Sequence, residues 1–409
     1  MTHRKTLEDL ANKIRYVKEE LDYFLDHHQP NWGYFDGELG SIHRNSTLRG
    51  GIDDSLVCYT YVPNGPRLMV NHSGSECRIN TYGDSFTDGA CVNDGETWQE
   101  VLAARLGEPV RNFGVGGYSS YQAYRRMVRM EKTDYKVPYL ILNIYMEDDN
   151  YRNIDLFRWV RWHVYMDRKP GKKFRMHHAN PCCHLRFNPE QADFEEAENP
   201  CPTPESLYQL TDPDFVFHFL ENDLTTQIIL AQNGYTVHNI DLLRRTAESL
   251  NLPLSFKDRN KCKEAASTLH WEVGLRSAIH VVKLWRQFCQ REKRRYLIAT
   301  CYDVELLGLQ LRGKKRADQL LIDWIKNERI PLFDAGASHT IDFKLYRCDP
   351  KTYMDQYYIG HYNPRGNFFF ASGMKEELLK VLDPKPILYD EKRALNSTVP
   401  LIHGCNFAL

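Results

Sequence analysis

The sequence has no excess of either charge. Its 409 residues include 53 basic and 54 acidic side chains, which leaves a formal net charge of −1. This balance excludes an overall electrostatic field that would draw the protein to nucleic acid or to an anionic membrane. We therefore expect neither nucleic acid nor a membrane as a partner.

Long apolar runs are also absent. Nowhere do about 18 apolar residues stand together, as a helix that spans a membrane would need. The first nine residues carry charged side chains and lack the apolar stretch of a secretory leader. The 11 cysteines are odd in number and scattered, which suits reduced thiols better than a disulfide framework. These absences predict a cytoplasmic protein.

What the sequence does contain is an alternation of short apolar runs and helical patterns. The β-prone runs lie at residues 77–82, 110–115, 139–145, 296–300 and 330–333. The helical patterns lie at residues 94–106, about 119–130, 320–327 and 373–382. Such alternation predicts an α/β fold, in which helices cover both faces of a doubly wound parallel sheet in three α/β/α layers.

The rest of the chain divides around this core. Apolar residues spaced by three and four predict one helix over residues 6–28, and turns and short strands follow up to residue 75. We expect a discontinuous core of residues 76–153 and 291–390, with 154–290 as a mostly helical insertion or lid. The N-terminal helical arm covers the sheet or packs on a second copy, so a homo-oligomer is one outcome.

The first candidate site is the turn Tyr82-Gly-Asp-Ser-Phe-Thr-Asp-Gly89, which ends the first strand of the core. A nucleophilic hydroxyl needs an exposed place at a strand end, with backbone N–H groups that face a developing oxyanion. Gly83 allows the tight turn and Ser85 supplies the hydroxyl. Taken alone, a Gly-Asp-Ser between a strand and a helix is more often a simple turn.

Three later segments also follow strands or precede the last helix, at residues 112–119, 145–153 and 360–367. They read Asn-Phe-Gly-Val-Gly-Gly-Tyr-Ser, Tyr-Met-Glu-Asp-Asp-Asn-Tyr-Arg-Asn and Gly-His-Tyr-Asn-Pro-Arg-Gly-Asn. In a doubly wound sheet, ligands collect outside the carboxyl ends of the strands. All four segments are therefore expected at one edge of the sheet.

In this order the four segments resemble the SGNH (GDSL-like) hydrolases, above all the subgroup that reads GDSFT-x-G and then N-x-G-V-x-G-Y. The resemblance covers residues 76–153 and 295–385. It implies that Ser85 is the nucleophile, that His361 is its base, and that the N–H of Gly117 helps to form the oxyanion hole. It further implies ester hydrolysis through an acyl-enzyme, and we expect neither a cofactor nor a metal.

Two residues depart from the family pattern. Glu147 stands where the family has an asparagine that donates to the oxyanion, and an ionised carboxylate there would repel the oxyanion. Tyr358 stands where an aspartate usually orients the histidine. The orienting group then has to be Asp355, Asp334, the Asp148–Asp149 pair or a backbone carbonyl.

These departures keep other functions open. Glu147, Asp148 and Asp149 beside Arg152 could act as acid and base in a glycosidase, or accompany acyl transfer to a sugar, on an SGNH scaffold. The same residues could simply cap a helix. A third alternative is a non-catalytic SGNH module that binds glycans.

Several further residues complete the candidate site. We place Asp84, Asn112, Arg152 and Trp159 with Gly117 in the oxyanion and substrate-binding set. The run Arg158-Trp-Val-Arg-Trp162 suits a sugar ring or an acidic group, although two tryptophans three apart also suit the core face of a helix. Together with the lack of a long apolar stretch, this run leads us to expect a small-molecule or carbohydrate substrate as the partner, such as an acylated carbohydrate or another small polar ester. The adjacent pairs in His177-His178 and Cys182-Cys183-His184 lack the spacing of zinc ligands.

Overall fold

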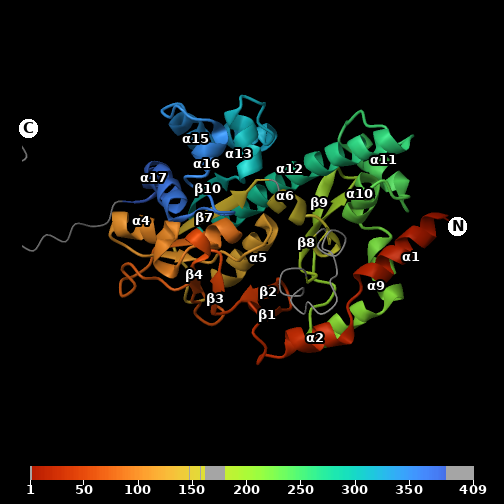
Figure 1. The fold of residues 1–409 in the computed structure, drawn as a ribbon, viewed down its shortest axis with the longest axis horizontal. Coiled ribbons are helices and arrows are strands. Elements are labelled where there is room, and N and C mark those ends of the chain that lie inside the picture. The colour runs from red at the N-terminus through yellow and green to blue at the C-terminus, as the bar shows by residue number, and fades with distance from the viewer. Residues whose placement is uncertain (1, 147, 157, 162–179, 384–409) are drawn as a thin grey trace, which may run out of the picture.

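A computed structural model describes residues 2–146, 148–156, 158–161 and 180–383 of the chain (Figure 1). At its centre lies a sheet of five parallel strands in the order β11-β10-β7-β5-β6. The strands are β5 (Ile79–Tyr82), β6 (Val110–Asn112), β7 (Tyr139–Tyr145), β10 (Arg295–Cys301) and β11 (Leu332–Asp334). All five predicted strands are thus present, and the predicted α/β class with a parallel sheet is confirmed.

The middle strand of the sheet is also its most apolar. In β7 every residue except Tyr145 is buried, because β5 and β10 pair with its two edges and helices pack against it. Consecutive side chains of a strand point to opposite faces, so an unbroken apolar run is stable only where both faces are covered. This explains why the near-continuous hydrophobic pattern of residues 139–145 identified the strand.

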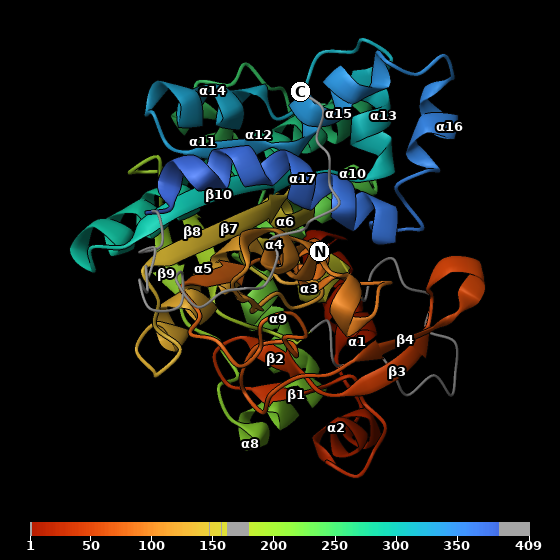
Figure 2. The same cartoon turned by 90° about the vertical axis from the view of Figure 1, so that its left-hand side faces the viewer.

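The helices of the core form two packed groups. In the first group α4 (Trp98–Leu106) contacts α17 (Pro364–Val381), and α17 also contacts β10 and β11. In the second group α12 (Arg259–Arg291) contacts both α5 (Ser120–Met130) and α14 (Gln319–Asn327). Figure 2 shows α17 lying along the sheet. The closing helix therefore begins at Pro364, nine residues before the predicted start at 373.

The predicted single helix over residues 6–28 is wrong, because the chain forms two helices there. These are α1 (Thr2–Ile14) and α2 (Lys18–Leu25), and between them the Tyr16 N–H donates to the carbonyl of Leu210. Helix α1 packs against α9 (Pro213–Leu220), which belongs to the predicted insertion (Figure 1). The arm therefore covers the insertion within its own chain, which neither of the two predicted alternatives described.

Two short hairpins complete the N-terminal region. The first pairs β1 (Gly33–Asp36) with β2 (Gly40–His43), and the second pairs β3 (Ser46–Arg49) with β4 (Leu56–Tyr59). A 3₁₀ turn, η1 (Ile52–Asp54), lies inside the second hairpin.

The described part of the predicted insertion contains a hairpin of β8 (His184–Asn188) and β9 (Asp193–Ala197) in addition to helices. Its helical elements are α8 (Pro204–Leu207), η3 (Tyr208–Thr211), α9, α10 (Leu224–Gln232), α11 (Ile240–Ser249) and α12. The last of these contacts β10 as well as α5, so it belongs to the helical layer of the core.

Six short elements lie near the ends of the core strands. They are α3 (Ser85–Asp88), η2 (Asp94–Glu96), α6 (Asp148–Arg152), α13 (Val304–Leu311), α15 (Ala335–Phe343) and α16 (Pro350–Met354). Within the described part of the chain, no helix has both the length and the apolar composition that a bilayer crossing requires.

A buried arginine ties the N-terminal region to the core. The Arg67 side chain is 1% exposed, and all five of its N–H groups donate hydrogen bonds. The acceptors are the carbonyls of Cys58, Asp88, Gly89 and Val92 and the carboxylate of Asp94. Four of these five residues lie between positions 88 and 94, so the guanidinium fixes the segment that follows the candidate nucleophile Ser85.

Replacing Arg67 should therefore lower the free energy of unfolding more than replacing a surface arginine does. Arg67→Ala removes five hydrogen bonds from the half-buried Asp94 carboxylate and four carbonyls, so we expect a loss of about 3–5 kcal/mol in the free energy of unfolding. Urea unfolding followed by circular dichroism measures this loss. Arg49→Ala, which removes an exposed arginine paired with Asp54, should change stability by less than about 0.5 kcal/mol. Equal losses for the two variants would contradict the role of Arg67.

Candidate functional site

The structure brings together Ser85 and His361, which are 276 residues apart in the sequence. Ser85 begins α3 directly beyond β5, and His361 lies three residues before α17. Their side chains face each other, with 2.8 Å between Ser85 Oγ and His361 Nε2. This is the distance of a good hydrogen bond, and it suits proton transfer from the hydroxyl to the imidazole.

The turn that presents Ser85 depends on a glycine and a buried cap. A side chain at Gly83 would collide with Thr87 Oγ1 and with the carbonyl of Asn143. Asp84 caps α3, because its carboxylate accepts a hydrogen bond from the Phe86 N–H. Burial raises the pKa of the Asp84 carboxyl to about 6, although the positive charge of Arg152 opposes the change. Asp84 is therefore a structural part of the site, with its oxygen Oδ2 3.3 Å from Ser85 Oγ.

The His361 ring is held between an aromatic side chain and the nucleophile. The Phe86 ring lies 4.9 Å from the His361 ring and 4.8 Å from that of Tyr145. Burial lowers the pKa of His361 to about 4, while the negative charge of Asp88 opposes this shift and Arg152 adds to it. The ring is therefore neutral at physiological pH, as a base that accepts the serine proton must be.

No described carboxylate contacts the second nitrogen of this ring. The Sγ of Cys91 lies 3.9 Å from His361 Nδ1, and burial raises the pKa of the Cys91 thiol, which keeps it protonated. Tyr358, at the place of the usual aspartate, is buried and donates its hydroxyl to the carbonyl of Tyr302.

The aspartates proposed to orient His361 are engaged elsewhere or are not described. Asp355 pairs with Lys351 at 2.6 Å, and Asp334 pairs with Arg316 at 2.6 Å. Glu147 lies outside the described residues. Asp148 begins helix α6 and Asp149 belongs to it, but their side chains are not described. The acid/base prediction for these three carboxylates therefore stays a prediction.

The glycine loop after β6 lies against an arginine. Gly117 has a φ of 81°, which is the left-handed region that favours glycine, and its carbonyl accepts a hydrogen bond from Arg158. A side chain at Gly117 would collide with that guanidinium. Asn112 is buried below the loop, where it donates to the Asp88 carbonyl and accepts from the Gly114 N–H. Asn112 thus supports the loop and does not face a substrate.

The prediction that Trp159 contacts a substrate is corrected by its burial. Its side chain is 1% exposed, and its ring lies 6.4 Å from that of Tyr16 on the N-terminal arm. Trp159 therefore belongs to the core, whereas Arg158 from the same segment reaches the site, and Trp162 lies outside the described residues. Arg152, at the end of α6, acts on the charges of both Asp84 and His361.

Three residues of the site were missed by sequence reasoning. Asp88, in the last position of α3, accepts a hydrogen bond of 2.8 Å from the Tyr61 hydroxyl. His43 Nδ1 lies 3.6 Å from the other oxygen of Asp88 and 3.0 Å from the same hydroxyl. Burial opposes ionisation of Asp88, but His43, Arg67 and Tyr61 outweigh it and hold the pKa of its carboxyl below the usual range. Asp88 stood in the quoted motif, but nothing in the pattern marked its partners.

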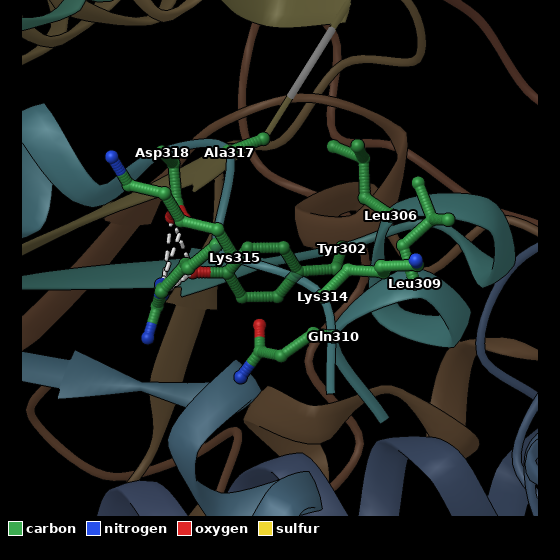
Figure 3. A pocket seen from close by; sticks show the side chains of 9 residues that line it. Tyr302, Leu306, Leu309, Gln310, Lys314, Lys315, Ala317 and Asp318 are labelled. Atoms are coloured by element: carbon green, nitrogen blue, oxygen red, sulfur yellow. Dashed lines mark hydrogen bonds and ion pairs between the residues drawn. The ribbon is translucent and has the colours of Figure 1, made fainter. Parts of the chain in front are cut away.

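Other polar groups lie apart from this site. A cavity of about 50 Å³ is lined by Tyr302, Gln310, Lys314 and neighbouring residues of α13, but by neither Ser85 nor His361 (Figure 3). Within the described ranges, no three His, Cys, Asp or Glu side chains gather as a metal site. Cys182, Cys183 and His184 are buried, while His177 and His178 lie outside the described residues.

Comparison with known proteins adds no family to these observations. Neither a scan against protein-family models nor a search of curated proteins finds a match for the chain.

The burial of His361 predicts an unusual titration. Nuclear magnetic resonance of labelled histidine should show a ring that stays neutral until the pH falls to about 4, with His361→Asn used to assign the signal. Because an unfolded histidine titrates near pKa ~6.5, the unfolded chain binds more protons between these values. The contribution of His361 to stability is therefore lost as the pH falls through this window. A His361 signal that titrates near its unfolded value would contradict the burial.

Proposed function

We propose that the chain is a serine hydrolase of the SGNH type, which cleaves an ester through an acyl-enzyme on Ser85. The observation that carries the proposal is the 2.8 Å contact between Ser85 Oγ and His361 Nε2 at the carboxyl end of β5. The strand order and the two helix groups support a doubly wound, three-layer arrangement. Strand β6 lies on one side of β5 and β7 lies on the other, so the direction of strand addition reverses at β5. In doubly wound sheets, ligands bind beside such a reversal, at the carboxyl ends of the strands.

The proposed reaction uses both members of this pair. His361 Nε2 accepts the hydroxyl proton while Ser85 Oγ attacks the carbonyl carbon of the ester. The N–H groups of Ser85 and Gly117 face the resulting oxyanion. His361 then returns the proton to the departing alcohol, and water attacks the acyl-enzyme by the same route, which releases the acid and frees Ser85.

An aspartate touching His361 Nδ1 is not needed for this scheme. When His361 takes the proton it becomes positive, and the ionised Asp88 carboxylate stabilises that charge across the site. The ring orientation comes from its packing on Phe86 and from its neighbour Cys91. We expect this arrangement to support slower proton transfer than a hydrogen-bonded aspartate would.

The proposed substrate is a small polar ester, such as an acylated carbohydrate. Arg158 contacts the Gly117 loop, and the positive charge of Arg152 acts on Asp84 beside Ser85, so this edge of the sheet is polar and positively charged, which suits a polar substrate. A long-chain lipid would instead require an extended apolar channel, whereas the side chains that contact Ser85 Oγ are the polar ones of His361 and Asp84.

The direct test measures turnover of p-nitrophenyl acetate. Ser85→Ala and His361→Gln should each lower kcat by about 10⁴-fold or more, because nucleophile and base act as a unit. Ser372→Ala and His218→Gln, on helices α17 and α9, serve as controls and should leave turnover unchanged. A fluorophosphonate probe should label the wild type but not Ser85→Ala. Ester turnover that is absent, or that survives the loss of Ser85, overturns the proposal.

The same panel distinguishes the carboxylate alternative. p-Nitrophenyl glycosides are offered to the wild type, Ser85→Ala and Glu147→Gln. Glycoside cleavage that is lost in Glu147→Gln but kept in Ser85→Ala would identify a glycosidase.

A further inference from the structure

A second histidine lies beside the nucleophile, and it comes from the N-terminal hairpins. His43 ends β2, outside the part of the chain that resembles the SGNH core. A Cβ placed on Gly116 would lie 3.3 Å from His43 Nε2, 3.1 Å from His43 Cε1 and 3.9 Å from Ser85 Cβ. The imidazole edge and the nucleophile therefore meet at the same point of the glycine loop.

The opposite edge of the His43 ring is fixed by hydrogen bonds. The Tyr61 hydroxyl has one hydrogen, which it donates to Asp88 Oδ1 at 2.8 Å. It can therefore only accept from His43 Nδ1, 3.0 Å away, so Nδ1 carries a proton. The ring also packs edge-on against Tyr61, with centroids 5.4 Å apart. These contacts leave Nε2 as the nitrogen that faces the loop.

Nothing in the described structure occupies that nitrogen. The His43 side chain is 14% exposed, and among the described residues no hydrogen-bond partner is found for Nε2. A histidine kept only for packing would have either both nitrogens bonded or its free edge in solvent away from the site. Here the free edge lies against Gly116, on the side of that residue where Ser85 Cβ also lies.

We propose that His43 is a catalytic residue of the Ser85 site and that its imidazolium form donates a hydrogen bond from Nε2–H to the oxyanion of the ester transition state. The inference rests on the function proposed above and deepens it. The ionised carboxylate of Asp88, 3.6 Å from Nδ1, stabilises a positive charge on the ring, and in that form Nε2 also has a proton to donate. The family pattern has an asparagine donor at the position of Glu147. In this chain His43 would supply the side-chain donor in its place.

No bond to His43 forms or breaks in this role. In the proposed role the imidazolium keeps both of its protons throughout the reaction, and its contribution grows as negative charge develops on the carbonyl oxygen of the ester. His361 remains the group that moves the proton. The two imidazoles thus divide the work, and Asp88 is the carboxylate that acts on the charge of both.

Two substitutions separate this role from a structural one. His43→Asn keeps an amide donor near the Nδ1 position for Tyr61 and Asp88, but it has no group at Nε2. His43→Gln instead brings an amide N–H to the position of Nε2. We expect His43→Asn to lower kcat for p-nitrophenyl acetate by about 10²–10³-fold, as the loss of one oxyanion donor does, with KM little changed. His43→Gln should recover at least tenfold of that loss.

The assay includes wild type, Ser85→Ala and His218→Asn, with turnover expressed per folded protein from circular dichroism. His218 is an exposed histidine of α9, so its substitution should leave kcat unchanged. Ser85-dependent turnover with His43→Asn as active as wild type overturns the inference alone. Asn and Gln variants that lose turnover equally also overturn it, since a merely structural histidine would give that result. Wild-type turnover that does not depend on Ser85 overturns both the function and the inference.

Discussion

The guanidinium of Arg67 is the interaction on which the site depends. It holds the carbonyls of Asp88 and Gly89, the last residue of α3 and the residue that follows it, and so fixes the short helix that carries both Ser85 and Asp88. That helix has a single turn and four residues, too few to be stable by itself. Its geometry is therefore maintained by neighbouring residues, and Arg67 donates hydrogen bonds to the carbonyls at its C-terminal end.

The N-terminal region that precedes β5 is therefore part of the site. Arg67, Tyr61 and His43 all precede β5, and each of them contacts α3 or the glycine loop opposite it. The Asp88 carboxylate accepts a hydrogen bond from the Tyr61 hydroxyl and lies 3.6 Å from His43 Nδ1. The Asp88 carbonyl accepts a hydrogen bond from Arg67. An isolated core of residues 76–153 and 291–390 would lack all three contacts.

The sequence predicted the sheet and the two residues at its carboxyl edge because both leave local signals. The run 139–145 is apolar without interruption, and Ser85 and His361 lie in glycine-containing segments that also hold characteristic neighbours. His43 and Tyr61 have no such context, since their role is created by tertiary contacts with Asp88. The same limit explains the helix predicted over 6–28: its periodicity is continuous, but the Tyr16 backbone pairs with Leu210 and breaks it. Trp159 was placed at the site because a tryptophan beside arginines suits a ligand, whereas its burial against Tyr16 follows from the fold of the arm.

In the proposed reaction, the environment of His361 imposes an energetic cost that the rest of the site must offset. Burial lowers the pKa of this base to about 4, so it is always free to accept a proton but accepts it less favourably than an imidazole in water. Each pKa unit corresponds to about 1.4 kcal/mol, so a base so weakened loses part of its driving force in the transition state. The loss is recovered only by interactions that appear together with the transferred proton and the developing oxyanion. In the proposed mechanism those are the Asp88 carboxylate, which stabilises the new positive charge on His361, and the N–H donors of the glycine loop, which stabilise the oxyanion. The proposed donation from His43 beside that loop would lower the energy of the same transition state, and so would offset part of the cost of the weak base His361.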